Sequence, residues 1–490
     1  MNLHRVFSRS SLARTLAFLL TLVLSSCTGL PVYSPKNLVA PGQVGSPSPE
    51  PDPREIIVWL ALSGGGTRAA ALAYGVMERL QEVAVQSDET QKTASNLLKE
   101  VDYISSVSGG SFAAAFYSLN KGNQGWGGSF KDRFLYRNIQ SAVLTRLFLP
   151  HNLLRVALTN YGRSDLAADY YDNYIFDGKK FRHLPERPQL IINSSDLVVG
   201  RRFEFTQQDF NCLGSWIADY RIADAVTASS AFPGAFTSIL LENHGPHNEC
   251  PSAPPDKKSL GRCLTVQESL SEQFVSTDKG EKLRNSIFVS AEKKRNYCQI
   301  PRTVRIHLSD GGITDNLGLE PLLHRLKDTS SRIYTQIQRK RAKALIVIAV
   351  NAATAPEEYL GTYLGSAWFG RVLLRGTDIF LEKASLETLR RTREEVFVEV
   401  QRLSPSTDVY FLEVTFEDIK DPVQKHRLQN LPTSLKLEQE EVVELIEVGR
   451  QLLEEGRDGD NGRDLEKICR DLFGPVKLLK AGERCIDVKP

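Results

Sequence analysis

Residues 103–117 read Tyr-Ile-Ser-Ser-Val-Ser-Gly-Gly-Ser-Phe-Ala-Ala-Ala-Phe-Tyr. A short apolar run leads to Ser108, which is followed by two glycines and then by an alanine-rich stretch that favours helix. This pattern is typical of a nucleophile elbow, in which a sharp strand-to-helix turn lifts a serine hydroxyl out of a sheet. Bulky neighbours would clash in such a turn, and the residues beside Ser108 are small. The stretch therefore predicts an α/β fold with Ser108 as a candidate nucleophile.

Apolar runs separated by helical segments predict the rest of the sheet. The run 56–62 and the run within 343–351 are continuously apolar, as in strands buried on both faces. Further strands are expected at 102–107, 189–193, 304–308 and 409–414. Helices are expected from about 67 to 85 and from about 110. Strands that alternate with helices predict a mostly parallel sheet covered on both faces.

The N-terminus has the parts of an export signal. Arg5, Arg9 and Arg14 form a positive region, and residues 15–24 form an apolar core too short for a stable membrane span. The core ends in Leu-Ser-Ser-Cys, which resembles the bacterial lipobox. In that type of signal the cysteine, here Cys27, is acylated with a fatty acid such as palmitate and becomes the mature N-terminus. We expect a protein anchored by lipid in a bacterial cell envelope, at the outer membrane or another membrane facing the periplasm. The alternative is an ordinary signal peptide whose cleavage site happens to precede a cysteine.

Composition divides the chain into four parts. Residues 1–26 are expected to be the signal peptide, and 27–54, rich in Pro, Ser and Gly, to carry the lipid anchor and an extended tether. Residues 55–352 are expected to be a catalytic domain, and 353–490 a helical extension that packs on it. A polar insertion at about 241–300 interrupts the catalytic domain, either as an active-site lid or as a surface excursion.

Charge and cysteine content limit the possible partners of the protein and the compartment in which it works. The net charge is +2, and removal of the three leader arginines leaves −1 (2 − 3), so no affinity for nucleic acid is expected. Six of the seven cysteines lie beyond Cys27, an even number that is compatible with disulfides in an exported chain. The natural pairs by proximity are Cys250–Cys263 and Cys469–Cys485; buried free thiols are the alternative.

A glycine-rich loop precedes the first expected helix. The N–H groups of Gly64, Gly65 and Gly66 can approach a ligand closely because no Cβ atoms intervene, and they are candidate donors to an oxyanion. A phosphate-binding Walker loop would need a lysine that this loop lacks, and the dinucleotide pattern lacks its third glycine. Arg68 follows in the first helical turn. Its side chain could anchor the loop, pair with a carboxylate, or point into solvent.

Asp310 is the candidate general base. It follows the strand expected at 304–308 and precedes two glycines, so that nothing crowds its carboxylate. Carboxylates are weak bases in water, and partial burial would raise the pKa of Asp310 toward a useful value. His307 offers a triad instead, but it lies three positions earlier and points to the opposite face of the strand. The sequence therefore favours a Ser108–Asp310 dyad.

In these segments the chain resembles the patatin-like phospholipase family. The matching segments are the glycine loop with Arg68, the serine motif 106–110, the Asp-Gly-Gly of 310–312 followed by Asp315-Asn316, and the stretch 225–236. The resemblance covers about residues 56–350. It implies a three-layer α/β/α sandwich with a mostly parallel central sheet and catalysis by a Ser–Asp dyad without metal or other cofactor.

The activity implied by this resemblance is hydrolysis of lipid acyl esters, of the phospholipase A or lysophospholipase type. The substrate would be a phospholipid or lysophospholipid of a membrane that the protein reaches through its anchor. A general carboxylesterase or thioesterase, and a catalytically silent lipid-binding lipoprotein, are the alternatives. Two apolar stretches, 144–154 and 367–374, are candidates for a lipid groove. Their helical spacing favours core helix faces over lipid contacts.

Overall fold

The computed structural model is built on an eight-stranded sheet. It describes residues 37–39, 55–85, 95–121, 125–159, 161–233, 236–244, 305–329, 331–354, 369–455 and 465–472. The strands of this sheet are β2 (Ile56–Leu62), β5 (Tyr103–Val107), β6 (Gln189–Asp196), β7 (Arg201–Glu204), β9 (Ile239–Glu242), β10 (Arg305–Asp310), β11 (Ala344–Asn351) and β12 (Asp408–Thr415). Their order is β12-β11-β2-β5-β6-β10-β9, with β7 paired to β6. The strands from β12 to β6 are parallel, whereas the pairings of β6 with β7 and β10, and of β10 with β9, are antiparallel.

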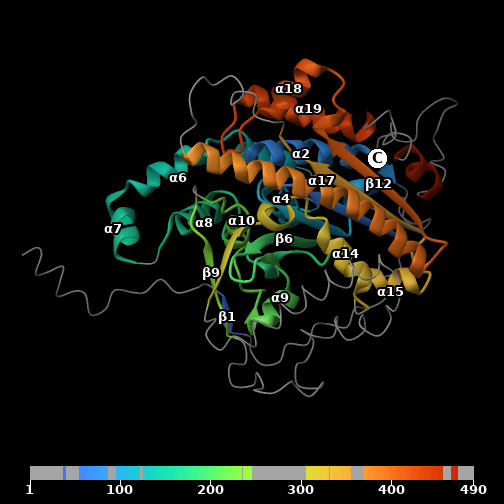
Figure 1. Ribbon diagram of the computed structural model, residues 1–490, viewed down its shortest axis with the longest axis horizontal. Helices are drawn as coiled ribbons and strands as arrows, with labels where there is room; N and C mark the ends of the chain where they lie inside the picture. The colour runs from blue at the N-terminus through green and yellow to red at the C-terminus, as the bar shows by residue number, and fades with distance from the viewer. Residues whose placement is uncertain are drawn as a thin grey trace, which may run out of the picture.

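Helices connect and cover these strands (Figure 1). The α-helices are α2 (Gly66–Glu82), α3 (Leu97–Glu100), α4 (Gly109–Leu119), α5 (Trp126–Phe130), α6 (Ile139–Leu147), α7 (Pro150–Leu158), α8 (Arg163–Tyr174), α9 (Gln207–Cys212), α10 (Ile222–Ser229), α13 (Gly312–Asp315), α14 (Glu320–Lys327), α15 (Arg332–Gln338), α17 (Phe369–Leu403), α18 (Pro422–Gln429) and α19 (Gln439–Glu455). The predicted helix at 67–85 is α2, and the helix predicted from about 110 is α4.

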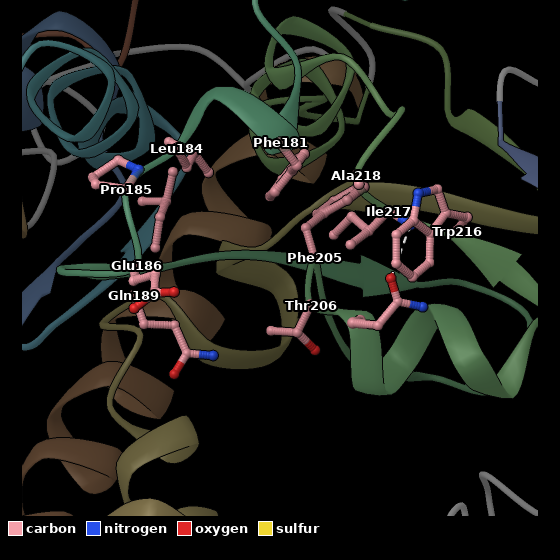
Figure 2. Close-up of a pocket in the computed structure, with 12 residues that line it drawn as sticks. Phe181, Leu184, Pro185, Glu186, Gln189, Phe205, Thr206, Trp216, Ile217 and Ala218 are labelled. Carbon is pink, nitrogen blue, oxygen red and sulfur yellow. Dashed lines mark hydrogen bonds between the residues drawn. The ribbon is translucent and has the colours of Figure 1, made fainter. Parts of the chain in front are cut away.

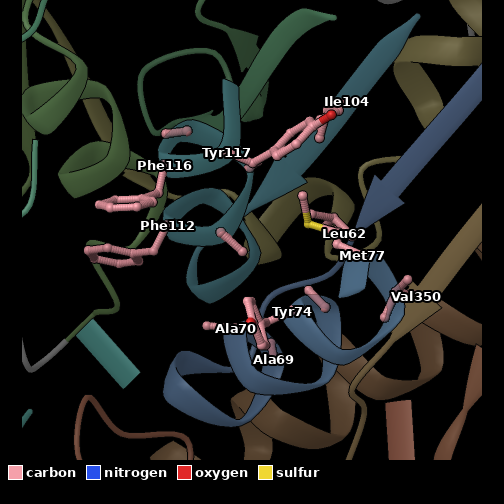
Figure 3. Packing of buried hydrophobic residues seen from close by; sticks show 14 of the residues in the cluster. Leu62, Ala69, Ala70, Tyr74, Met77, Ile104, Phe112, Phe116, Tyr117 and Val350 are labelled. Atoms are coloured by element: carbon pink, nitrogen blue, oxygen red, sulfur yellow. The ribbon is translucent and has the colours of Figure 1, made fainter. Parts of the chain in front are cut away.

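Two hydrophobic cores lie on opposite faces of the sheet, because successive strand residues point in opposite directions. Leu60 and Leu62 of β2 enter a core shared with α2, α4 and α19. Figure 3 shows this core, with Leu62 near α2 and the aromatic rings of α4 packed beyond it. Trp59 and Ala61 enter the second core, which includes residues of α14, α15 and α17. The structure thus confirms the three-layer α/β/α fold with a mostly parallel sheet.

The chain beyond residue 353 contributes a strand as well as helices. β12 pairs in parallel with β11 along its whole length, so the strand predicted at 409–414 is confirmed. α19 packs on α2 with unusually close backbones, since a Cβ atom on Gly75 would lie 2.1 Å from the carbonyl oxygen of Ile446. Figure 1 shows α18 and α19 together on this side of the molecule. The central sheet therefore draws on the chain from 56 to 415.

The predicted tether, 27–54, contains a short stretch that is part of the folded body. β1 (Leu38–Val39) pairs antiparallel with β8 (Ser215–Trp216). The side chain of Asn37 is buried, donates to Ser215 Oγ and to the Glu242 carbonyl oxygen, both at 2.7 Å, and accepts from Glu242 N at 2.8 Å. The rest of this segment, and the signal peptide with Cys27, lie outside the described residues.

Most of the predicted insertion and the expected disulfides also lie outside the described residues. This holds for residues 245–304 and for Cys250, Cys263, Cys298 and Cys485. Cys469 is buried and disulfide-bonded, and its pairing with Cys485 stays a prediction. Within the described ranges, no helix combines the length and the apolar character needed to cross a membrane.

Candidate active site

Ser108 lies in the strained turn that its sequence predicts. It joins β5 to α4 with φ 47° and ψ −118°, a backbone conformation that residues other than glycine rarely adopt. Ser229, at the end of α10, joins the turn to β6. Ser108 N donates to the Ser229 hydroxyl at 2.8 Å, and that hydroxyl donates to the Asn193 carbonyl oxygen at 2.6 Å. The α4 N-terminus follows directly and favours negative charge beside the Ser108 hydroxyl. The turn is thus built to present this oxygen at the carboxyl end of the parallel strands.

The glycine loop between β2 and α2 presses against this turn. A Cβ atom on Gly109 would lie 2.0 Å from the Gly66 carbonyl oxygen, and one on Gly64 would lie 3.3 Å from Ser108 Cβ. Only glycine allows these two backbones to approach so closely. Gly66 itself has φ +61°, which a side chain would strain.

The three candidate oxyanion donors are not equivalent. The N–H of Gly64 donates to the carbonyl oxygen of Asn316 at 3.0 Å. This hydrogen bond joins the glycine loop to the segment that follows Asp310. Within the described part of the chain, the N–H groups of Gly65 and Gly66 have no such acceptor. Of the three candidate donors, Gly65 and Gly66 therefore have the N–H groups more available to an oxyanion.

Asp310 meets Ser108 at the end of β10. Its buried carboxylate accepts the Ser108 hydroxyl and, at 2.8 Å, the N–H of Gly312. Burial raises the pKa of Asp310 from the ordinary 3.8 to about 6, while both hydrogen bonds act in the opposite direction. A carboxylate with this pKa is ionised at neutral pH and is a better base than one in water.

The end of α10 connects the serine and aspartate loops. Asp310 N donates to the Ala231 carbonyl oxygen at 3.0 Å, and Gly311 N donates to the Ser229 carbonyl oxygen at 3.1 Å. Ser229 therefore supports both candidate catalytic residues, through its side chain and its backbone. Sequence reasoning assigned it no role, although it lies in the 225–236 stretch that carries part of the family resemblance. Asn193 and Asn316 were likewise given none, because their contacts join segments far apart in the chain.

His307 lies away from the dyad. It is on the exposed face of β10 and its Nδ1 is 3.1 Å from the Ser238 hydroxyl, whereas Asp310 is buried. This is the arrangement that alternation along the strand predicts, and it leaves Asp310 in direct contact with Ser108.

Arg68 is buried rather than solvated. Its guanidinium donates to the carbonyl oxygens of Ala352, at 3.1 Å, and Leu431, and to Thr433 Oγ1 at 3.2 Å. The neighbouring Thr67 N donates to the Ser434 carbonyl oxygen at 2.8 Å. The first turn of α2 is therefore fixed to a loop nearly 370 residues further along the chain (434 − 67), which holds the glycine loop in place.

One cavity of about 370 Å³ lies elsewhere (Figure 2). Its walls include the aromatic rings of Phe181, Phe205 and Trp216 together with Gln189, the first residue of β6. Gln189 is paired with Tyr103 at the start of β5, whereas Ser108 follows the end of β5. The cavity thus lies at the amino ends of β5 and β6, whereas the candidate dyad lies beyond the carboxyl end of β5, and none of the predicted site residues line it.

Of the two stretches considered for a lipid groove, residues 144–154 span parts of α6 and α7. The expectation of core helix faces is wrong there for Leu144, Leu149, Leu153 and Leu154, which are exposed. The side chains of 367–374 lie outside those that the structure describes.

Comparison with known proteins identifies the family. A family model described as patatin-like phospholipase matches residues 60–323, just over half of the chain. The chain belongs to the patatin-like phospholipase family. The matched range contains Ser108, Asp310 and the glycine loop, and it ends before β11.

Among solved structures, human GIVD cytosolic phospholipase A2 is similar, with a TM-score of 0.40 and 11% sequence identity. The similarity covers 84% of this chain but 62% of the human chain, less than two thirds of its length. No curated protein sequence matches this chain. Within the described residues, no cluster of three or more His, Cys, Asp or Glu side chains is arranged to hold a metal ion.

Proposed function

We propose that this patatin-like protein is a lipid acyl hydrolase of the phospholipase A or lysophospholipase type. The observation that carries the proposal is the hydrogen bond from the Ser108 hydroxyl to the buried carboxylate of Asp310, beside the N–H groups of Gly65 and Gly66. A nucleophile, a base and oxyanion donors are the parts that cleavage of a carboxylic ester requires.

The proposed reaction has two halves. Asp310 takes the proton of Ser108 as the serine oxygen attacks the acyl carbonyl, and the oxyanion is held by the N–H groups of Gly65 and Gly66. Asp310 then returns the proton to the departing alcohol, which leaves an acyl-enzyme on Ser108. In the second half Asp310 activates a water molecule, and attack on the acyl-enzyme releases the fatty acid and restores the serine.

We further propose that Cys27 carries a lipid anchor in a bacterial cell envelope, as its lipobox-like context suggests. Asn37 is fixed to the folded body by three hydrogen bonds. Asn37 lies ten positions after Cys27 (37 − 27), and ten fully extended residues span at most about 35 Å. An anchor at Cys27 would therefore keep the body close to the membrane that bears its substrate.

The test is fatty-acid release from phospholipid vesicles by the full chain and by three variants. We expect Ser108→Ala and Asp310→Asn to lose at least about 10⁴-fold in rate, as expected when either member of a dyad is removed. His307→Ala is the matched control on the same strand and is expected to keep its activity. A fluorophosphonate probe should label the parent at Ser108 and leave Ser108→Ala unlabelled.

Other outcomes point to the alternatives. Equal rates on short soluble esters and on vesicles would indicate a general esterase or thioesterase. No release by the parent, together with no labelling of Ser108, would overturn the enzymatic function and leave a lipid-binding protein on a hydrolase fold.

A further inference from the structure

α6 and α7 carry an apolar face that the rest of the described protein does not cover. We call it the α6–α7 face, and its five residues with their exposed fractions are Leu144 (52%), Phe148 (65%), Leu149 (41%), Leu153 (45%) and Leu154 (60%). Single exposed apolar residues are ordinary on protein surfaces, but five within eleven positions of two consecutive helices are a concentration of the kind that marks an interaction site. Figure 1 shows both helices at one end of the molecule.

The opposite sides of these helices are fixed to the body, so the face is not a frayed end. Ile139 and Val143 of α6 are buried in the core. The buried side chain of Asn152, on α7, donates to the carbonyl oxygen of Arg146 at 2.8 Å and joins the two helices. The Arg146 guanidinium stacks on Tyr170 of α8, 4.8 Å from the ring centre. Each helix therefore has one attached side and one apolar side in solvent.

The surroundings of the face are basic. Residues 137–163 contain four arginines and no aspartate or glutamate. Arg137, Arg155 and Arg163 are exposed, and Arg155 lies 3.7 Å from Asp169 of α8. An apolar helical surface with a basic rim fits the boundary between the acyl chains and the anionic headgroups of a membrane.

The start of α6 is attached to the loop that also holds the first turn of α2. Ile139 N, at the start of α6, donates to the Leu435 carbonyl oxygen at 3.2 Å. The adjacent residue, Ser434, accepts the N–H of Thr67, which follows directly after the oxyanion loop. One short loop thus joins the start of α6 to the first turn of α2, so the helices that carry the face are tied to the helix that follows the oxyanion loop.

From these observations we infer that the α6–α7 face binds the surface of an anionic lipid bilayer, as a second membrane contact besides the expected anchor. The inference rests on the proposed function in taking membrane lipid as the substrate. A second copy of the chain is a poorer partner, because a two-fold contact would bring the arginines of 137–163 together without acidic residues of that segment to oppose them.

The test measures sedimentation of the protein with vesicles. All chains carry Cys27→Ser, to remove the expected lipid attachment, and Ser108→Ala, to prevent breakdown of the vesicles. The face variant adds Leu144→Ser, Phe148→Ser and Leu154→Ser. The matched control instead adds Leu386→Ser and Val398→Ser, which replace exposed apolar residues on α17. Vesicles are of phosphatidylcholine alone or mixed with phosphatidylglycerol, and melting midpoints verify that each variant is folded.

We expect the face variant to bind mixed vesicles at least about tenfold more weakly than the parent, because three apolar side chains no longer enter the bilayer. The control should bind as the parent does, and vesicles without phosphatidylglycerol should bind the parent more weakly. Unchanged binding by the face variant would overturn the inference. So would a parent that sediments as a dimer and becomes monomeric on substitution, since a second copy would then cover the face.

A parallel assay separates this inference from the proposed function. With Ser108 intact, the face variant should hydrolyse a soluble short-chain ester at the parent rate and vesicle phospholipid more slowly. If the parent cleaves neither substrate, the proposed function fails, whereas the sedimentation result still decides the membrane contact because it needs no catalysis.

Discussion

At the scale of single residues, the candidate site depends on a few backbone groups held by serine and asparagine side chains. The Ser229 hydroxyl accepts from Ser108 N and donates to the Asn193 carbonyl oxygen, so it replaces a ladder bond that the turn cannot make. Asn316 performs a similar task for the glycine loop, because its carbonyl oxygen holds Gly64 N. The positions of Ser108 and Asp310 therefore depend on these supporting hydrogen bonds as well as on the two residues themselves.

The pH dependence of the reaction should follow Asp310. The free base requires an ionised carboxylate, and the pKa of Asp310 is raised to about 6 by burial. We expect kcat/KM for ester hydrolysis to be level above about pH 7 and to fall tenfold per pH unit below about 6. A pH profile on a soluble ester measures this, and a rate still level at pH 5 would contradict it.

The same ionisation affects stability in a defined direction. Between about pH 4 and 6 the folded protein retains a proton at Asp310 that the unfolded chain has released, because the pKa is 3.8 unfolded and about 6 folded. Stability therefore falls as pH rises through this window and stays lower above it. Asp310→Asn should raise the free energy of unfolding at pH 7 by up to about 3 kcal/mol and change it little at pH 4. Denaturant titration at both pH values checks this.

Ser229→Ala should reduce activity by impairing the support of Ser108. The substitution leaves the Ser108 N–H buried without its acceptor, which costs about 1–3 kcal/mol. We expect kcat to fall about 10–100-fold with little change in KM. Ser230→Ala is the control, since among the described residues the Ser230 hydroxyl donates to carbonyl oxygens of the preceding helix, those of Val226 and Thr227. Equal effects of the two substitutions would argue against a positioning role for Ser229.

At the scale of elements, the packing of α19 on α2 fixes the helix that follows the glycine loop. The two helices approach through glycines, Gly75 on α2 and Gly449 on α19, where a Cβ atom would lie 2.1 and 2.5 Å from backbone oxygens of the other helix. Backbone atoms cannot move aside as a flexible side chain can. The loop at 431–434 completes the attachment through Arg68 and Thr67.

Gly75→Ala should therefore destabilise the protein, although alanine in a helix interior normally stabilises it by about 1 kcal/mol. We expect a loss of about 1–3 kcal/mol, as for other overpacked contacts, because α19 must shift. Gly128→Ala on α5 is the matched control, since nothing lies within 4 Å of the position of its Cβ atom. Thermal unfolding of both variants measures the two changes in stability. A Gly75→Ala variant as stable as the parent would show that α19 can shift without cost.

At the scale of the whole molecule, the sheet extends beyond the matched family region. That region ends at residue 323, whereas β11 spans 344–351 and β12 spans 408–415. β11 lies between β2 and β12, and every one of its residues is buried. The part of the chain after 353 thus covers an edge of the sheet that would otherwise be open to pairing with other molecules.

A chain ending at residue 354 should fail to fold into a soluble monomer. It would lack β12, α17 and α19, leaving the edge of β11 and the apolar side of α2 in water. We expect aggregation on expression, compared with the full chain under the same conditions and measured by size-exclusion chromatography and circular dichroism. A monomeric, cooperatively unfolding product would show that the region after 354 is an independent addition.

Local sequence was sufficient to predict the main strands and the turn at Ser108. Continuous apolar runs identify β2 and β11, because a strand buried on both faces needs apolar side chains at every position. Small residues around Ser108 predict its turn, because only small residues fit there. Both signals arise from requirements that neighbouring residues impose on one another.

Other features depend on contacts between distant parts of the chain, and no short pattern contains them. The attachment of Asn37 to β9, the support of Ser108 by Ser229 and the commitment of Gly64 N to Asn316 join segments from 121 to 252 residues apart (229 − 108, 316 − 64). The exposure of Leu144 and Leu154 could not be predicted from their helical spacing either, because that spacing is the same for a core face and for a face in solvent. The strands and the turn at Ser108 were predictable from the residues alone, since they follow from local sterics and from burial. Which backbone donors keep no acceptor and which apolar face meets the solvent depend on what the rest of the chain covers, so the folded arrangement was needed to find them.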